Sequence, residues 1–290
     1  MNSMAHSPYP IVPRDDLDFG LDGDVPRFWF EGDPFKTRMF DALSAQFPEG
    51  EKFFINSVRE FRDQVTDPAT QQEIRDFIRQ EGQHSRVHRQ FNDRLREQGI
   101  NVDRIEEYQR EEYAFAREHF SKTFNLAMTA AAEHMTAIMA HTFFVRGTID
   151  KADPRIRAMY AWHAIEEIEH KSVAYELLVN TAKAGYWMRF RAMLQATLLF
   201  PVETFLIMRA MFRADGFGFW QKTGLWLKGL WWLYRPGGVY MNVTMLRHYF
   251  AWYRPGFNPW QNGEMAHYRR WLDIFNKSGD PIAAGAAAGI

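Results

Sequence analysis

The stretches Glu81-Gly-Gln-His84 and His163-Ala-Ile-Glu-Glu167-Ile-Glu-His170 decide how this chain folds. Each contains a Glu-x-x-His pair, and each lies in a segment whose apolar residues recur at helical spacing. Residues three apart on a helix lie one turn apart on the same face, so the carboxylate and the imidazole of each pair point the same way. Two such helices, each with a partner helix that supplies one more glutamate, can surround a pair of metal ions in a four-helix bundle.

Four helices of this kind are predicted between residues 34 and 183. Asp33-Pro34, Asp67-Pro68 and Asp153-Pro154 each combine an N-cap aspartate with a proline at the first helical position, which is typical of a helix start. Residues 100–120 are charged and are expected to contain the crossover from the second helix and the start of the third. Two antiparallel hairpins joined by a longer link predict an all-α fold, a ferritin-like four-helix bundle.

Three parts of the chain are predicted. Residues 1–33 are rich in Pro, Gly and Asp and are expected to form an N-terminal extension that covers the surface or stays mobile. Residues 34–183 form the predicted ferritin-like di-metal bundle. Residues 184–290 are expected to add aromatic-rich, basic helices that pack on the bundle, and their low-complexity end, residues 285–290, is expected to fray.

The composition excludes several classes of protein. With 290 residues the chain can bury a sizeable core, and its net charge of −1 gives no electrostatic reason to expect a nucleic-acid partner. The absence of cysteine excludes disulfides, thiolate zinc sites and iron–sulfur clusters. Residues 1–24 have neither the basic nor the apolar segment of a signal peptide, which predicts a cytoplasmic protein.

Four glutamates fall on the apolar stripes of the predicted helices. Glu81 and Glu167 belong to the Glu-x-x-His pairs, and Glu51 and Glu133 occupy core positions of the first and third helices. Buried glutamates are rare unless they are paired or bind metal, and four in one core repel one another strongly. Any one of them could be an ordinary surface charge, but the pattern in chain order favours two divalent cations that balance four carboxylates.

His163 lies one turn before Glu167 on the same side of the fourth helix and adds a third imidazole. His88 is expected behind the ligands, whereas Glu166 and Glu169 are expected to project into solvent. Carboxylates and imidazoles suit two iron ions, with manganese or a mixed manganese–iron pair as alternatives and zinc as a weaker one. The expected assignment is Glu51 and His84 on one metal, Glu133, His163 and His170 on the other, and Glu81 and Glu167 bridging.

Several further motifs occur together in this chain: Pro26-Arg-Phe-Trp29, Ala42-Leu-Ser-Ala-Gln-Phe-Pro-Glu-Gly-Glu51, Gln80-Glu-Gly-Gln-His84, Trp162-His163 and Tyr253-Arg-Pro-Gly-Phe-Asn-Pro-Trp260. In these motifs the chain resembles a bacterial family of predicted metal-dependent hydrolases, over most of residues 25–262. The metal motif is also similar to that of p-aminobenzoate N-oxygenase-type di-iron enzymes, which carry the same extra histidine. That similarity implies the same seven ligands and leaves the substrate open.

Two enzyme classes fit these residues. The preferred prediction is a non-haem di-iron oxidoreductase that activates dioxygen and oxidises a small apolar, lipid-like substrate, with no catalytic residue separate from the metal ligands. An external electron donor, a ferredoxin or a flavin reductase, would be needed because no flavin or nicotinamide fold is recognisable. The alternative is a binuclear metal-dependent hydrolase that uses a bridging hydroxide. Iron storage is disfavoured by the long aromatic extension.

The C-terminal third is apolar and basic. Residues 183–254 hold ten Lys or Arg but only two acids, Glu203 and Asp215. The apolar run 192–212 contains a proline and two charged residues, so a membrane span is not expected. The region either covers the bundle or faces anionic lipid headgroups, which would place the protein at the inner membrane face. The oligomeric state is left open, and a dimer is compatible with the sequence.

Overall fold

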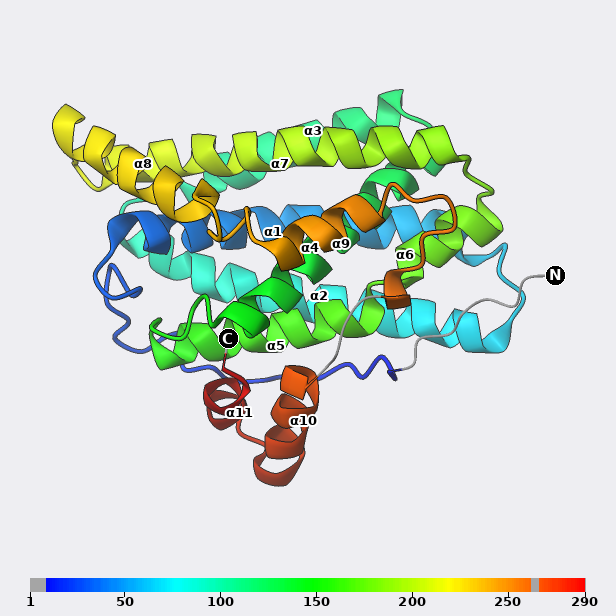
Figure 1. The fold of residues 1–290 in the computed structure, drawn as a ribbon, viewed down its shortest axis with the longest axis horizontal. Coiled ribbons are helices and arrows are strands. Elements are labelled where there is room, and N and C mark those ends of the chain that lie inside the picture. Colours follow the sequence, from blue (N-terminus) through cyan, green and yellow to red (C-terminus); the bar gives the residue numbers. More distant parts are fainter. Residues whose placement is uncertain (1–8, 262–265, 290) are drawn as a thin grey trace.

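The computed structural model describes residues 9–261 and 266–289. Over these residues the secondary structure is helical and includes no strand, and a single isolated backbone bridge joins Phe30 to Ala152. The prediction of an all-α fold is confirmed. Figure 1 shows long helices in layers, with α7 along one side of the molecule and α2 and α5 along the other.

Four long helices enclose the core: α1 (Pro34–Arg62), α2 (Pro68–Glu97), α4 (Lys122–Arg146) and α5 (Pro154–His170). Helices α1 and α5 each pack against both α2 and α4, so the four close a ring around a common interior. The predicted hairpins correspond to α1–α2 and α4–α5. The ferritin-like assignment and the division into three parts stay predictions.

The predicted helix starts agree with the structure. Asp33 accepts hydrogen bonds from the backbone amides of Phe35 and Lys36, and α1 begins at Pro34, the residue after Asp33. Asp67 and Asp153 cap α2 and α5 in the same way, each followed by proline. Because proline has no amide hydrogen to leave unsatisfied in the first turn, these three pairs fix where the bundle helices begin.

Two predicted boundaries are wrong. Residues 100–120 do not merely connect helices, because Val102–His119 forms a full helix, α3, that packs across α1. The fourth bundle helix does not run to Lys183. It ends at His170 and is followed by the short α6 (Val173–Glu176) and a π-helical segment, η1 (Leu177–Thr181). A π-helical segment is a single local turn, here of five residues, and is too short for the apolar pattern of the sequence to reveal it.

Pro48 lies inside α1 without ending it. Proline cannot donate to the carbonyl four residues earlier, so the carbonyl of Ser44 is left without its helical partner. The side-chain amide of Asn92, on α2, donates to that carbonyl across 3.1 Å. The irregularity of α1 is therefore compensated by α2, and it fixes the orientation of the Asn92 side chain.

The N-terminal segment packs against the bundle. Phe19, Leu21, Trp29 and Phe30 are buried, and the indole of Trp29 donates to Asp41 of α1 across 2.9 Å. Residues 9–33 therefore lie over the bundle, which is the first of the two expected alternatives, a surface cover, and not the second, a mobile tail. Their Pro, Gly and Asp residues separate large apolar side chains, and burial of those side chains holds the segment against the bundle.

The C-terminal region adds the helices α7 (Tyr186–Ala214), α8 (Phe219–Tyr234) and α9 (Val243–Ala251), followed by the 3-10 turn η2 (Pro259–Gln261). Helix α7 packs along α1 and α4, α8 packs on α1, and α9 packs on α4. By length and composition α7 could cross a membrane, with a mean hydropathy of 1.3 over its most apolar window, of which 22% is buried. Core helices of soluble proteins also pass that test.

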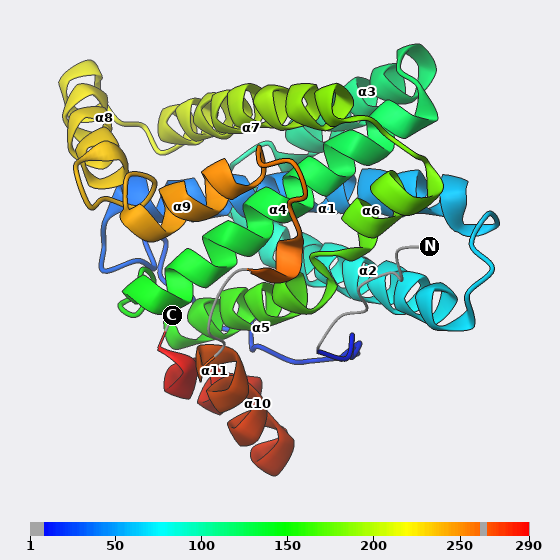
Figure 2. The ribbon, with the colours of Figure 1, turned by 45° about the vertical axis from the view of Figure 1, so that its right-hand side comes forward.

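The last two helices, α10 (Ala266–Ser278) and α11 (Pro281–Ala288), lie on the opposite side of the bundle, where α11 packs against α5 and α10 packs against α11 (Figure 2). A Cβ atom on Gly285 would lie 2.8 Å from the Cα atom of Ala158, so glycine allows α11 and α5 to approach closely. The expectation of a frayed end is wrong up to residue 289. Small residues, which suggest low complexity in the sequence, permit tight helix packing here.

Candidate metal centre

All seven predicted ligands are buried in the interior enclosed by α1, α2, α4 and α5: Glu51, Glu81, His84, Glu133, His163, Glu167 and His170. Their carboxylate oxygens and imidazole nitrogens form overlapping groups of three, in each of which one atom from each residue lies within 4.8 Å of the others. The side chains predicted from two short motifs and two isolated glutamates therefore meet in one place. Their role as ligands stays a prediction.

The first group surrounds the Nε2 atom of His170. This nitrogen lies 3.1 Å from an oxygen of Glu81, 3.2 Å from an oxygen of Glu133 and 3.6 Å from an oxygen of Glu167. Two atoms bound to one cation at about 2.1 Å and at right angles lie about 3.0 Å apart. The spacing of His170, Glu81 and Glu133 is therefore compatible with neighbouring ligands of a single ion, and it is also that of an ion pair when His170 is protonated.

The second group surrounds the Nδ1 atom of His84. This nitrogen lies 3.9 Å from an oxygen of Glu81 and 3.8 Å from an oxygen of Glu167, and Glu51 joins Glu81 and His84 in one of the groups of three. Glu81 thus belongs to groups around both His84 and His170. Glu167 approaches the same two imidazoles. These are the two glutamates expected to bridge.

Many polar atoms of these groups have no hydrogen-bond partner although they are buried. They are both carboxylate oxygens of Glu81 and of Glu133, Oε1 of Glu51, Nδ1 of His84 and Nε2 of His170. A buried polar group without a partner costs about 1–3 kcal/mol, and more when it is charged. Among the described residues no Lys or Arg pairs with these oxygens, and one protonated imidazole, that of His170, cannot balance four carboxylates, so divalent cations fit the arrangement chemically.

The outer nitrogens of two imidazoles are already engaged. Nε2 of His84 donates to Glu166 across 3.1 Å, and Nδ1 of His170 donates to the side-chain oxygen of Gln80 across 2.9 Å. An imidazole that donates through one nitrogen carries its lone pair on the other, which here faces the interior group. Metal-binding histidines are oriented by hydrogen bonds of this kind.

Glu166 and Glu169 are fully buried, so the expectation that they project into solvent is wrong. The guanidinium of Arg14 bonds to both, 3.0 Å from Glu166 and 2.7 Å from Glu169. Gln80 also donates to Glu169, across 2.8 Å, and so does the hydroxyl of Tyr268, across 2.9 Å. The N-terminal segment and α10 cover this face of α5. Apolar residues on every side of the 154–170 segment were the one hint of it.

His88 takes part in a chain of hydrogen bonds behind the centre. Asn92, held by the carbonyl of Ser44, presents its oxygen to the Ser44 hydroxyl, which donates across 2.9 Å. That hydroxyl therefore accepts from Nδ1 of His88 across 2.8 Å. Nε2 of His88 then accepts from Nδ1 of His163 across 2.7 Å. His88 thus contacts the predicted ligand His163, and it also forms a group of three with Glu51 and His163; its expected place behind the ligands stays a prediction.

This series of hydrogen bonds ends at the contact between His163 and Glu167, which requires a proton or a cation. With its Nδ1 hydrogen donated to His88, a neutral His163 presents a lone pair at Nε2, which lies 2.9 Å from an oxygen of Glu167. Two acceptors at this distance repel unless a proton or a cation lies beside them. The separation is again that of neighbouring ligands, so His163 and Glu167 meet the same requirement as the first two groups.

His163 lies with a different partner from the one expected. It forms a group with His84 and Glu167, and its ring stacks on that of His84 with centroids 4.1 Å apart. The assignment to the metal of Glu133 and His170 does not match this placement. Helices α2 and α5 run antiparallel here, so one turn back from Glu167 leads toward His84 and away from His170.

The electrostatics reflect crowding of carboxylates. Burial, and then repulsion by Glu81, raises the pKa of Glu51 well above the usual carboxyl range. Burial, and then repulsion by Glu133, does the same to the pKa of Glu81. Burial and the charge of Glu167 raise the pKa of Glu133 to about 7. Burial acts likewise on Glu167, but His170 and His163 outweigh it and hold its pKa well below the usual value. Without cations this centre retains protons at neutral pH.

Comparison with protein families identifies the chain. A family model described as "Predicted metal-dependent hydrolase" matches residues 13–263. The chain belongs to this family. No curated protein and no solved structure matches it. The family description and the buried clusters support a metal-dependent enzyme, and the description favours the hydrolase alternative over the di-iron oxidoreductase that the sequence analysis preferred.

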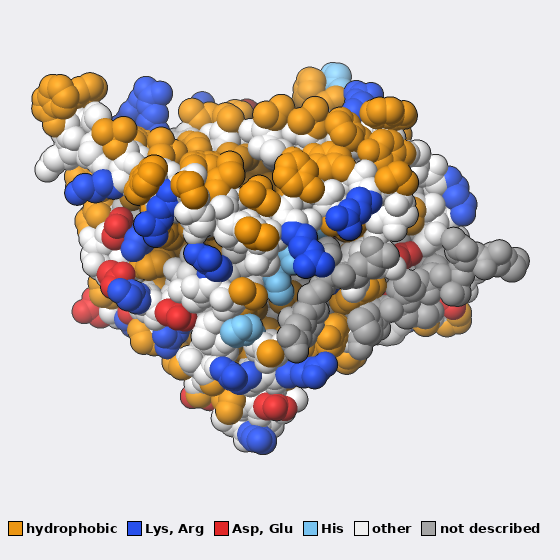
Figure 3. All heavy atoms as spheres, viewed as in Figure 1, with side chains coloured by type: hydrophobic (Ala, Val, Ile, Leu, Met, Phe, Trp, Pro, Cys, Tyr) orange, Lys and Arg blue, Asp and Glu red, His pale blue; other side chains and the backbone are white. Residues whose placement is uncertain are grey.

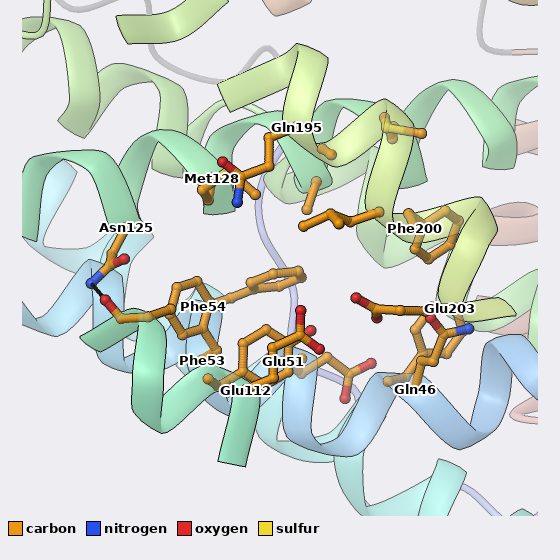
Figure 4. A pocket seen from close by; sticks show the side chains of 18 of the residues that line it. Gln46, Glu51, Phe53, Phe54, Glu112, Asn125, Met128, Gln195, Phe200 and Glu203 are labelled. Atoms are coloured by element: carbon orange, nitrogen blue, oxygen red, sulfur yellow. Dashed lines mark hydrogen bonds between the residues drawn. The ribbon is translucent and has the colours of Figure 1, made fainter. Parts of the chain in front are cut away.

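In this predicted metal-dependent hydrolase a cavity of about 290 Å³ adjoins the centre. It lies between α1, α3, α4 and α7, and Glu51 is the predicted ligand that lines it. Most of the lining is apolar, including Phe53, Phe54, Met128 and Phe200. Figure 4 shows the carboxyl groups of Glu51, Glu112 and Glu203 pointing into this space. The cavity suits an apolar substrate whose polar group lies near Glu51.

Proposed function

We propose that this protein is a hydrolase that uses a pair of divalent cations to cleave an apolar ester or amide. The observation that carries the proposal is the set of orphaned carboxylate and imidazole atoms beside an apolar cavity. The family description supports the reaction class. The metals proposed are iron or manganese, alone or mixed, with zinc as a further possibility for hydrolysis.

The cations would be held by Glu51, Glu81, His84, Glu133, His163, Glu167 and His170, and they would supply a water of lowered pKa and an electrophile for the substrate carbonyl. The protein's own contribution is orientation. Arg14 holds Glu166 and Glu169, Glu166 holds His84, and Gln80 links Glu169 to His170. Each inner nitrogen is thereby fixed before any ion binds.

The cavity determines which substrates reach the centre. Phe54, Met128 and Phe200 offer an apolar wall, so a hydrocarbon chain gains by leaving water there. Burial, and then the nearby Glu112 carboxylate, raises the pKa of Glu203 to about 8. The proton of Glu203 is shared with Glu112 in a hydrogen bond, so the two carboxyl groups together offer polar atoms to a substrate in an otherwise apolar space.

Hydrolysis is tested with soluble nitrophenyl esters of increasing acyl length and protein loaded anaerobically with manganese, zinc or ferrous iron. Metal-dependent release of nitrophenol that rises with acyl length and stops on chelation is expected. Glu81→Gln should abolish it, whereas Glu97→Gln, an exposed glutamate on the same helix, should not. Absence of hydrolysis in every metal form would contradict the proposal.

A non-haem di-iron oxidoreductase is the second candidate. It is favoured by one observation, the burial of four glutamates and their imidazole partners inside a helical bundle without aspartate or lysine. Such a donor set suits iron that reacts with dioxygen, and turnover would need electrons from a ferredoxin or a flavin reductase. Exposure of the reduced iron protein to dioxygen should then give a transient visible absorption, and substrate oxidation should consume dioxygen. Ester cleavage without dioxygen separates the two candidates.

A further inference from the structure

Helices α7, α8 and α9 present large apolar side chains to solvent. On α7 the exposed residues of this surface recur every four or seven positions along one face, and α8 and α9 extend the surface. We call this surface the α7–α9 face; its residues are Trp187, Leu194, Leu198, Val202, Leu206, Phe219, Trp220, Leu227, Trp231, Val243 and Phe250. Trp220 is 81% exposed and Trp187 is 71% exposed. Figure 3 shows hydrophobic side chains gathered over these three helices.

The same three helices and the turns beside them carry positive charge. Their exposed basic residues are Arg191, Arg209, Arg213, Lys228, Arg235, Arg247 and Arg254. The two acids of residues 183–254 do not offset them. Glu203 points into the cavity, and the side chain of Asp215 is 1% exposed and bonded to Arg38 and Arg27. The face is therefore apolar and cationic.

Helix α7 lies along the bundle and does not leave it. Its inner residues Ala192, Met193, Met208 and Phe212 are buried against the rest of the molecule, while the opposite side carries the exposed stripe. A helix that crossed a bilayer would have to give up those contacts. An amphipathic helix whose other side is already packed can instead lie in the plane of a membrane surface.

The cavity reaches the surface beside this face. Leu199 of α7 lines the cavity and is itself 38% exposed, and it adjoins Leu198 of the α7–α9 face. Phe115 and Phe120 also line the cavity and are exposed. Leu199 therefore gives the cavity an apolar edge next to the α7–α9 face, although Gln195 and Glu203 of α7 also line the cavity.

We propose that the α7–α9 face docks on the surface of an anionic lipid bilayer. Exposed tryptophan, phenylalanine and leucine enter the boundary between headgroups and chains, and the basic residues pair with acidic headgroups. Symmetric pairing with a second copy is disfavoured because it would set basic residues against basic residues across the interface. Entry of a lipid-like substrate through this face rests on the proposed function, whereas docking itself does not.

The test is co-sedimentation of the full chain with vesicles of neutral phosphatidylcholine or of phosphatidylcholine with 30% phosphatidylglycerol. Binding to the anionic vesicles, little binding to neutral ones and release by high salt are expected, because the negative surface potential attracts the basic residues and salt screens that attraction. Trp220→Ala with Leu227→Ala, and separately Lys228→Glu with Arg247→Glu, should each lower the bound fraction at least fivefold.

A matched control distinguishes the effect of charge on the α7–α9 face from the effect of charge elsewhere on the surface. Arg75→Glu with Arg89→Glu makes the same charge change at exposed positions of α2, which is not in extensive contact with α7, α8 or α9, and should bind like the unaltered chain. Equal losses in both charge variants would overturn the proposal. So would a dimer in solution that needs Trp220 and Leu227 while vesicles stay unbound. Hydrolysis of a soluble ester by the α7–α9 face variants, assayed without vesicles, should be unchanged. The ester assay therefore tests the proposed function, and the vesicle assay tests docking separately.

Discussion

The Nδ1 atom of His170 donates to the side-chain oxygen of Gln80 across 2.9 Å, and the other end of the same amide donates to Glu169. Gln80 therefore cannot rotate its amide without losing both contacts. The bond fixes which nitrogen of His170 faces Glu81 and Glu133. A residue outside the predicted ligand set thus orients one imidazole of the centre.

Replacement of Gln80 by alanine should weaken metal binding about 10- to 100-fold, because the ring of His170 would lose the partner that orients it. Metal titration followed by calorimetry measures this. Gln90→Ala removes an exposed glutamine from the same helix and should leave the affinity unchanged. Equal affinities for all three proteins would mean that Gln80 has no part in metal binding.

Glu81→Gln should lower the metal content from two ions per chain to one or none, since Glu81 belongs to the groups around both His84 and His170. Elemental analysis of freshly purified protein gives the content directly. Removal of one buried carboxylate also relieves repulsion, so the metal-free variant should unfold at a higher temperature than the metal-free parent. A variant that still retains two ions would refute the bridging role.

Arg14→Ala should destabilise the fold by about 3 kcal/mol or more at pH 8, because it leaves Glu166 and Glu169 buried without their cation. Urea unfolding of the metal-free protein measures the loss. Arg79→Ala removes a solvent-exposed pair with Asp15 and should have little effect. Similar losses for both would show that the buried network contributes no more than a surface ion pair.

Glu203→Gln should change the pH dependence of stability. Because the folded state raises the pKa of Glu203 to about 8, this carboxyl binds its proton more tightly folded than unfolded. Its contribution to stability is complete below its usual value near 4.5 and is lost as the pH rises to about 8. The melting temperature of Glu203→Gln relative to the parent should therefore climb between pH 4.5 and 8 and then level off. A difference independent of pH would contradict the assignment.

Met128→Trp should obstruct the cavity of about 290 Å³. If the cavity holds the acyl chain, KM for a long-chain ester should rise at least tenfold while a two-carbon ester is hydrolysed as before. Unchanged metal content provides the internal control for folding. A similar change for both esters would indicate that the substrate binds elsewhere.

The sequence was sufficient to predict the all-α fold, three capped helix starts and the burial of the seven candidate ligands. These features depend on local spacing and on the cost of isolated buried charge, both of which are present in the chain itself. The surroundings were not predictable in the same way. Arg14 lies more than 150 residues from Glu166, and nothing in local periodicity indicates that the N-terminal segment covers that face of α5.

The partner of His163 was assigned wrongly for a related reason. Spacing places His163 one turn from Glu167, but which imidazole it meets depends on the direction in which α2 runs past α5. The buried positions of Glu166 and Glu169 likewise depend on α10, which lies about 100 residues later in the chain. Long-range docking decides both questions, and the helical pattern of one segment contains no information on it.

Pro48 gives the centre an unusual origin. Because α1 cannot form its own hydrogen bond at this position, the Ser44 carbonyl accepts one from the Asn92 side chain. Through the Ser44 hydroxyl and His88, Asn92 then sets the tautomer of His163. A more regular helix would supply its own amide donor to the Ser44 carbonyl and leave the Asn92 side chain without this contact. Replacement of Pro48 by a residue with an amide hydrogen would therefore remove the contact that orients Asn92. The irregularity of α1 at Pro48 thus contributes to the arrangement of the centre.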